Sequence, residues 1–102
     1  MSGRYLKVSE VLTELHVDLE FLHALEAEDL IHLKRTLDDD LVISSGDVER
    51  VHMAQVLTGD LDVNLPGVEV IMHMRDSMLA MRQQFSEILD ALVAEVRRHM
   101  ER

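Results

Sequence analysis

Apolar side chains recur at three- and four-residue intervals near the start of the chain, in two groups separated by a polar break. The groups are Val8, Val11, Leu12 and Leu15, then Phe21, Leu22 and Leu25. This spacing predicts two short helices, from Ser9 to about His16 and from about Leu19 to Glu28. Ser9 and Asp18 are the expected N-caps, because their side-chain oxygens accept hydrogen bonds from first-turn N–H groups. Two short helices joined by a tight turn form a helix-turn-helix.

The segment LIHLKRTLDDDLVIS, which starts at Leu30, places a polar turn between two apolar stretches. The pattern predicts a short two-stranded hairpin, a wing, with three consecutive aspartates at its tip. A third helix is predicted to begin at Ser44, with Asp47 completing a capping box, and to end near Gly59.

Asn64 is the expected N-cap of a fourth helix, and Pro66 and Gly67 lie in its first turn, where a missing N–H does least harm. From Val68 to Arg102 no Gly or Pro interrupts the helical pattern. Apolar residues there alternate three- and four-residue steps, the spacing of a coiled-coil seam. They are Ile71, Met74, Met78, Met81, Phe85, Ile88 and Leu92.

A helix of thirty-odd residues extends roughly 45–50 Å, which is too long for one helix of a compact domain of this size. A second copy of the chain is the simplest cover, so we expect a homodimer, paired either parallel or antiparallel. The predicted dimer interface consists of Met74, Met78, Met81, Phe85, Ile88 and Leu92. A helix folded back on its own head is the alternative. The predicted fold is mainly α, with a winged helix-turn-helix head over residues 1–74 and a coiled-coil-like dimerisation helix over residues 75–102.

Composition narrows the class of protein further. The 102 residues include no Cys, which excludes disulfides, thiolate metal sites and a Cys nucleophile. The first residues lack the apolar core of a secretory signal. No run approaches the ~20 apolar residues that a membrane span needs. We therefore expect a cytoplasmic protein.

The net charge of −10 is unevenly distributed along the chain. Residues 1–74 carry five basic and fifteen acidic side chains, whereas residues 75–102 carry five of each. The whole negative excess therefore lies on the predicted head. Such an asymmetry bears on the choice of partners rather than on the fold.

The order of these elements resembles the MerR-like winged helix-turn-helix superfamily over nearly the whole chain. VSEVLTELHVDLEFLHALEAEDLI is similar to its first two helices, including a Glu at position 26, and ISSGDVERV is similar to its wing-to-helix junction. DVNLPGVEVIM resembles one branch, which contains the heat-shock repressors and the CbpM-type chaperone modulators. The short length and acidic head look most like the chaperone modulators. The resemblance therefore implies a non-enzymatic inhibitor that binds the J-domain of a DnaJ-like, CbpA-type co-chaperone and blocks its access to Hsp70.

DNA-binding members of this superfamily carry basic residues on the second helix and on the wing, because neutralising phosphates supplies most non-specific affinity. Here the second helix offers Glu20, His23, Glu26 and Glu28, and the wing tip is acidic. Lys34, Arg35 and Arg50 are too few to offset the repulsion. We therefore expect the fold to be retained without its DNA role, although a DNA-binding transcriptional regulator of the heat-shock-repressor branch is the main alternative.

An acidic face of this shape would attract a basic protein, and the J-domain carries a basic helix. The predicted partner-binding residues are Asp18, Glu20, Glu26, Glu28, Asp29, Asp38, Asp39 and Asp40. Two other interpretations remain. In one, the carboxylates form only a solvated face that keeps the protein in solution; in the other, the protein is a dimeric anti-regulator whose carboxylates mimic DNA.

Other chemistry has little support in the sequence. The six His residues show no metal-ligand spacing such as HExxH, and no Gly-rich loop offers a phosphate site. The Met residues between 72 and 81 are expected to form core or dimer seam rather than a promiscuous groove. No catalytic residue, metal or cofactor is expected.

Overall fold

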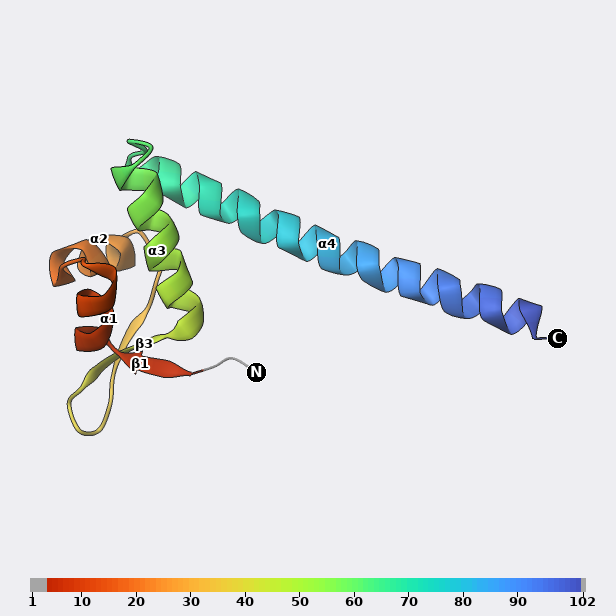
Figure 1. Cartoon of the computed structure of the whole chain (residues 1–102), viewed down its shortest axis with the longest axis horizontal. Helices are drawn as coiled ribbons and strands as arrows, with labels where there is room; N and C mark the ends of the chain where they lie inside the picture. The colour runs from red at the N-terminus through yellow and green to blue at the C-terminus, as the bar shows by residue number, and fades with distance from the viewer. Residues whose placement is uncertain (1–3, 102) are drawn as a thin grey trace. The chain divides into compact units, whose positions relative to one another are not determined.

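The computed structural model describes residues 4–101, which form two compact units, one ending at Val70 and one beginning at Ile71. These residues contain four helices and a three-stranded sheet (Figure 1). The elements are β1 (Tyr5–Lys7), α1 (Val8–Leu15), α2 (Leu19–Ala27), β2 (Leu33–Arg35), β3 (Leu41–Ser44), α3 (Ser45–Gly59) and α4 (Leu65–Met100). The predicted fold class, a mainly α winged helix-turn-helix with a long C-terminal helix, is confirmed.

The helix-turn-helix forms where the apolar spacing predicted it, but its first N-cap differs. Helix α1 begins at Val8, and Lys7 is the N-cap without a side-chain hydrogen bond. The prediction of Ser9 as N-cap is wrong, because strand β1 runs directly into the helix and leaves no free turn before it. Asp18 is confirmed as the N-cap of α2: its Oδ1 accepts from the backbone N–H of Phe21 at 2.8 Å.

The wing is confirmed as the antiparallel pair β2–β3, and a third strand joins it. Strand β1 pairs antiparallel with the other side of β3, which gives the order β1-β3-β2. Leu6, Ile43 and Leu33 lie opposite one another in register, so the three strands present one apolar row to the helices. Strand β1 was not predicted, because three residues with polar neighbours show no usable alternation.

Helix α3 begins after Ser44, whose Oγ accepts from the backbone N–H of Asp47 at 3.1 Å, as predicted. The predicted capping box is wrong in its second half. The carboxylate of Asp47 accepts from the backbone N–H of His32 at 2.9 Å and so ties the helix to the start of the wing.

The head is held together by a small apolar core, to which the helices, strand β3 and the segment before β2 contribute side chains. Its buried members are Val8, Val11, Leu22, Leu25, Leu30, Ile31, Ile43, Val51, Ala54 and Val68. No polar or charged side chain is buried among the described residues. The core therefore depends on burial of apolar area, at about 25 cal/mol per Å², rather than on an internal polar network.

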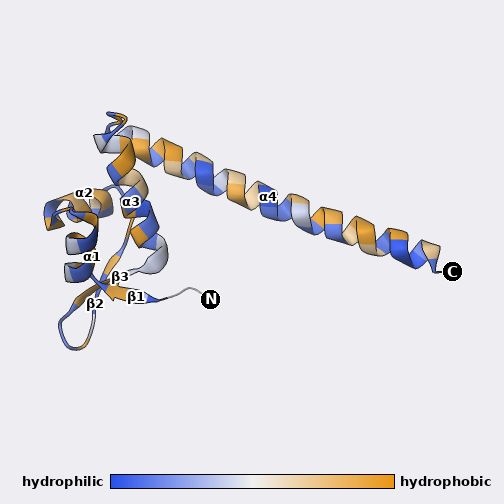
Figure 2. Cartoon of the chain, viewed as in Figure 1, coloured by the Kyte–Doolittle hydropathy of each residue, from blue (hydrophilic) through white to orange (hydrophobic). Residues whose placement is uncertain are grey.

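Helix α4 is 36 residues long, as the unbroken seam predicted, and therefore measures about 54 Å. Asn64 caps it, its Oδ1 accepting from the backbone N–H of Gly67 at 2.8 Å. A Cβ at position 67 would lie 2.7 Å from the Cγ1 of Val63, which explains the glycine in this first turn. Orange and blue bands alternate along α4 in Figure 2, so apolar and polar side chains share its surface.

The cap of α2 gives a stability prediction. Asp18→Ala should lower the free energy of unfolding by about 1 kcal/mol, because the N–H of Phe21 loses its acceptor. Urea denaturation followed by circular dichroism would measure the change. Thr13→Ala is the control, because the Thr13 hydroxyl donates only to a carbonyl inside α1. Equal stability of Asp18→Ala and the wild type would contradict the capping role.

Candidate functional site

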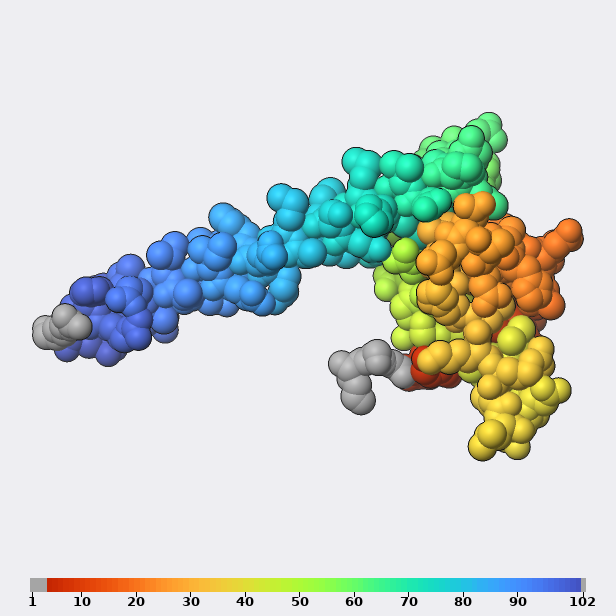
Figure 3. Space-filling model, turned by 180° about the vertical axis from the view of Figure 1, so that it is seen from behind, coloured from red at the N-terminus to blue at the C-terminus, as the bar shows by residue number. Residues whose placement is uncertain are grey.

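The tip of the wing is an ordered loop that presents carboxylates. The backbone N–H of Thr36 donates to the carbonyl of Asp40, and the Asp40 N–H donates to the Thr36 hydroxyl. Asp39 adopts a left-handed backbone conformation with φ of 66°, which Asp tolerates better than most residues. Asp38, Asp39 and Asp40 are all exposed, and the wing (yellow) projects from the head in Figure 3.

Helix α2 and the residue after its C-cap carry a second set of carboxylates. Glu20 and Asp29 are exposed, and Glu28 is half-buried at the C-cap. The Nδ1 of His23 lies 3.8 Å from Glu26 and the Nε2 of His32 lies 3.6 Å from Asp29, which are separate pairs. Within residues 4–101 no group of three or more His, Asp or Glu residues is arranged to hold a metal ion.

Two of the predicted partner-binding residues also stabilise the fold. Asp18 caps α2, and the Oε2 of Glu26 accepts from the backbone N–H of Leu33 at 3.0 Å. Their carboxylates remain negatively charged surface groups, but their removal would disturb the head itself. Glu20, Glu28 and Asp29 are therefore the better positions at which to test binding.

Three of the five basic residues in positions 1–74, Lys34, Arg35 and Arg50, bond to other groups of the protein. The Nζ of Lys34 donates to the Tyr5 hydroxyl at 2.9 Å and lies 5.1 Å from the ring centroid. The hydrogen bond to Tyr5 raises the pKa of Lys34. Arg35 donates to the carbonyl of Asp39 at 3.0 Å and pairs with its carboxylate at 3.3 Å. The Nε of Arg50 donates to the carbonyl of Leu30 at 2.7 Å.

A hollow of about 320 Å³ lies between the start of α1, the start of α2 and the wing. Leu12, Leu19 and Leu41 contribute its apolar lining, and Asp39 and Asp40 contribute carboxylates. The remaining lining residues are Lys7, Val8, Ser9 and Arg35. This hollow could not be predicted from the sequence, because its lining residues come from four separate segments that lie together only in the folded chain.

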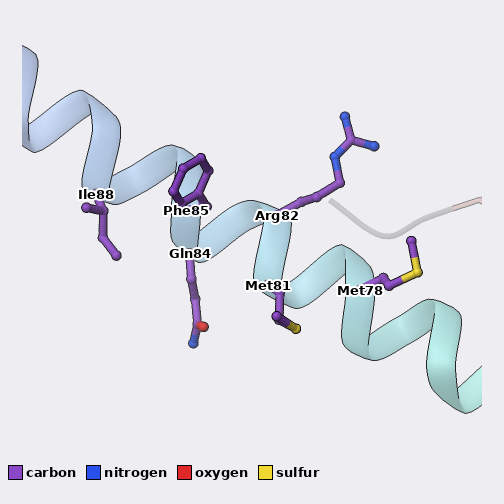
Figure 4. A pocket seen from close by; sticks show the side chains of 6 residues that line it. All are labelled: Met78, Met81, Arg82, Gln84, Phe85 and Ile88. Carbon is purple, nitrogen blue, oxygen red and sulfur yellow. The ribbon is translucent and has the colours of Figure 1, made fainter.

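Helix α4 exposes an apolar face of its own. The six side chains predicted to form the dimer interface, Met74, Met78, Met81, Phe85, Ile88 and Leu92, are 56% to 67% exposed. Figure 4 shows the side chains around Phe85, all of which come from this one helix. These side chains therefore line an open face of α4 and not an enclosed cavity. No helix among the described residues is long and apolar enough to cross a membrane.

A comparison with known protein families matches residues 6–89 to the family described as MerR HTH family regulatory protein. The matched range runs from β1 through the wing and α3 into α4. No curated protein sequence matches the chain.

The hydrogen bond between Glu26 and Leu33 gives a second stability prediction. Glu26→Ala should destabilise the fold by about 1–2 kcal/mol, because the half-buried N–H of Leu33 loses a charged acceptor. Glu26→Gln keeps an acceptor oxygen and should recover most of this loss. Urea denaturation measures both, with Glu20→Ala as the neutral control. An equal loss in all three variants would rule out a specific role for this hydrogen bond.

Proposed function

The chain belongs to the MerR HTH family of regulatory proteins, and from this premise we propose that it regulates a protein partner and not a DNA site. The proposed partner is the J-domain of a DnaJ-like, CbpA-type co-chaperone. The chain then acts as a non-enzymatic inhibitor, as the resemblance to CbpM-type chaperone modulators implies.

The observation that carries this proposal is the sign of the charge on the helix-turn-helix and wing. A DNA-binding relative needs cations on these elements, whereas here they carry Glu20, Glu28 and the exposed aspartates of the wing tip. Each close carboxylate–phosphate contact would cost about 1 kcal/mol or more where water is partly excluded. Several such contacts are enough to cancel ordinary non-specific DNA affinity of ~10⁻⁴–10⁻⁶ M.

The proposed mechanism needs only occupancy. The basic helix of a J-domain is the surface that docks on Hsp70, so a carboxylate face that covers it blocks that contact. Complementary charge chiefly accelerates association and selects the partner. Affinity then requires a few buried apolar contacts at the centre of the interface.

We further propose that two copies of the chain pair through α4. The exposed apolar seam supports this, because contact with water is unfavourable for the large apolar side chains of Met78, Phe85 and Ile88. Their three- and four-residue alternation matches knobs-into-holes packing between long helices. Such a dimer would present two acidic heads and so two docking surfaces.

A DNA-binding transcriptional regulator is the second candidate, because the family description itself is that of a regulatory helix-turn-helix protein. The outer face of the sheet also carries Lys7 and Lys34, which flank Val42 in register. Elution from a heparin or DNA column separates the two functions. Salt-dependent retention would favour the regulator, and flow-through at low salt would favour the modulator.

The J-domain proposal predicts salt-sensitive binding. The wild type should bind the J-domain of its own organism's DnaJ-like protein at low salt, measured by isothermal titration calorimetry, and less tightly at high salt because screening weakens exposed charge contacts. Glu20→Lys and Asp38→Lys should each weaken binding by severalfold or more. No binding of the wild type at low salt would end the proposal.

The matched control for these reversals is Asp60→Lys, at the C-cap of α3, outside both sets of predicted contact residues. It changes the net charge by the same amount as Glu20→Lys. If Asp60→Lys weakened binding as much as Glu20→Lys, the effect would come from the overall charge and not from the proposed face.

The dimer proposal predicts the mass in solution. The wild type should sediment as a dimer, and Phe85→Asp should sediment as a monomer with reduced helix content, because it buries a carboxylate in the seam. Gln83→Asp is the matched control, since position 83 lies about 200° around the helix from position 85. A wild type that remains monomeric at all concentrations tested would refute the dimer.

A further inference from the structure

We propose that the hollow between α1, α2 and the wing receives an apolar side chain from a basic amphipathic helix of the partner. This inference rests on the proposed function, because it assigns the apolar anchor of the same docking surface. The proposed occupant of the hollow is a helical protein segment with Lys or Arg beside its apolar face, and not a small ligand.

The apolar lining of the hollow is accessible from solvent. Leu19 is among the large apolar side chains that remain exposed on the head, and Leu12 and Leu41 are half-buried behind it. Removing such side chains from water on binding stabilises a complex, and central apolar anchors supply most of the affinity of protein interfaces. The hollow is thus suited to supply the affinity that a purely charged surface lacks.

Charge complementarity identifies the occupant. Asp39 and Asp40 belong to the lining, and Leu19 itself stands between Asp18 and Glu20 in the sequence. Arg35 is paired with Asp39, and Lys7 balances Asp40 in number, so the lining itself carries no net charge. The excess of carboxylates lies around it, on the exposed side chains of Asp18 and Glu20 next to Leu19 and of Asp38 next to Asp39. An apolar side chain that enters here therefore arrives best with cationic neighbours, as on one face of a basic amphipathic helix.

The chemistry of the lining argues against a small-molecule site. Ligand pockets hold a few fixed polar groups that orient the ligand, within roughly 300–1,000 Å³. At about 320 Å³ the hollow is at the lower end of that range. Its polar lining residues are Lys7, Ser9, Arg35, Asp39 and Asp40, and all of them are exposed, so none is held in a buried position from which it would orient a small ligand.

The test removes or fills the hollow without changing its charge. Leu19→Ser removes an apolar wall, and Ser9→Trp places a large side chain into the space from an exposed position on α1. Both should weaken binding to the J-domain by about tenfold or more, while the dependence of affinity on salt stays that of the wild type. Leu61→Ser, at another exposed leucine, is the matched control and should bind as the wild type does.

A synthetic Lys- and Leu-rich helical peptide, and its variants with single Leu→Ala changes, make the test specific. One Leu→Ala change in the peptide should weaken its binding to the wild-type protein. The same change should reduce affinity for the Ser9→Trp variant much less, because the introduced Trp already keeps that Leu out of the hollow. Circular dichroism confirms that each protein variant is folded, and Ser9→Trp decides the matter if Leu19→Ser is unfolded.

The outcomes separate the two levels of the proposal. If Ser9→Trp and Leu19→Ser bind the J-domain like the wild type while Glu20→Lys weakens binding, the hollow is not the anchor and the proposed function stands. If the wild type binds neither the J-domain nor the peptide at low salt, the proposed function fails and the docking role of the hollow fails with it.

Discussion

Two carboxylates fix the wing to the helices, and the geometry of the head depends on them. Asp47 of α3 accepts from the N–H of His32, and Glu26 of α2 accepts from the N–H of Leu33. These consecutive N–H groups lie where the chain enters strand β2, so both helices hold the same point of the backbone. Hydrogen bonds to charged acceptors are stronger than neutral ones, at about 1.5–3 kcal/mol. The wing therefore stands in a defined place beside the start of α2, and the hollow between them exists because of it.

Local signals predicted the elements of this fold, and contacts between distant segments account for what they missed. The helical spacing of apolar residues and the caps Asp18, Ser44 and Asn64 act within a few residues, so the sequence displays them directly. Strand β1 exists only because β3 pairs with it, and the Ser9 cap failed for the same reason. The partner of the Asp47 carboxylate, fifteen residues away, could not be read from a capping pattern.

The candidate site shows the same division. The excess of carboxylates on the helix-turn-helix and wing tip is visible in the printed sequence. Their unequal duties are not, because only the folded chain shows that Asp18 and Glu26 each bond to the backbone while Glu20 stays exposed. The hollow also required coordinates, since Leu12, Leu19 and Leu41 meet through tertiary packing. The charge of the head could thus be predicted from the sequence, whereas the position of its apolar hollow could be found only from the packing of the folded chain.

The strand order β1-β3-β2 leaves two strands each with an open side, and the cations of the head are concentrated there. Both outer strands have only three residues; Lys7 lies on β1, and Lys34 and Arg35 lie on β2. Very short edge strands that carry Lys or Arg resist pairing with strands of other molecules, which is how many native sheets avoid aggregation. These cations therefore have a structural effect that involves no nucleic acid: they disfavour the pairing of a strand from another molecule with either edge of this small sheet.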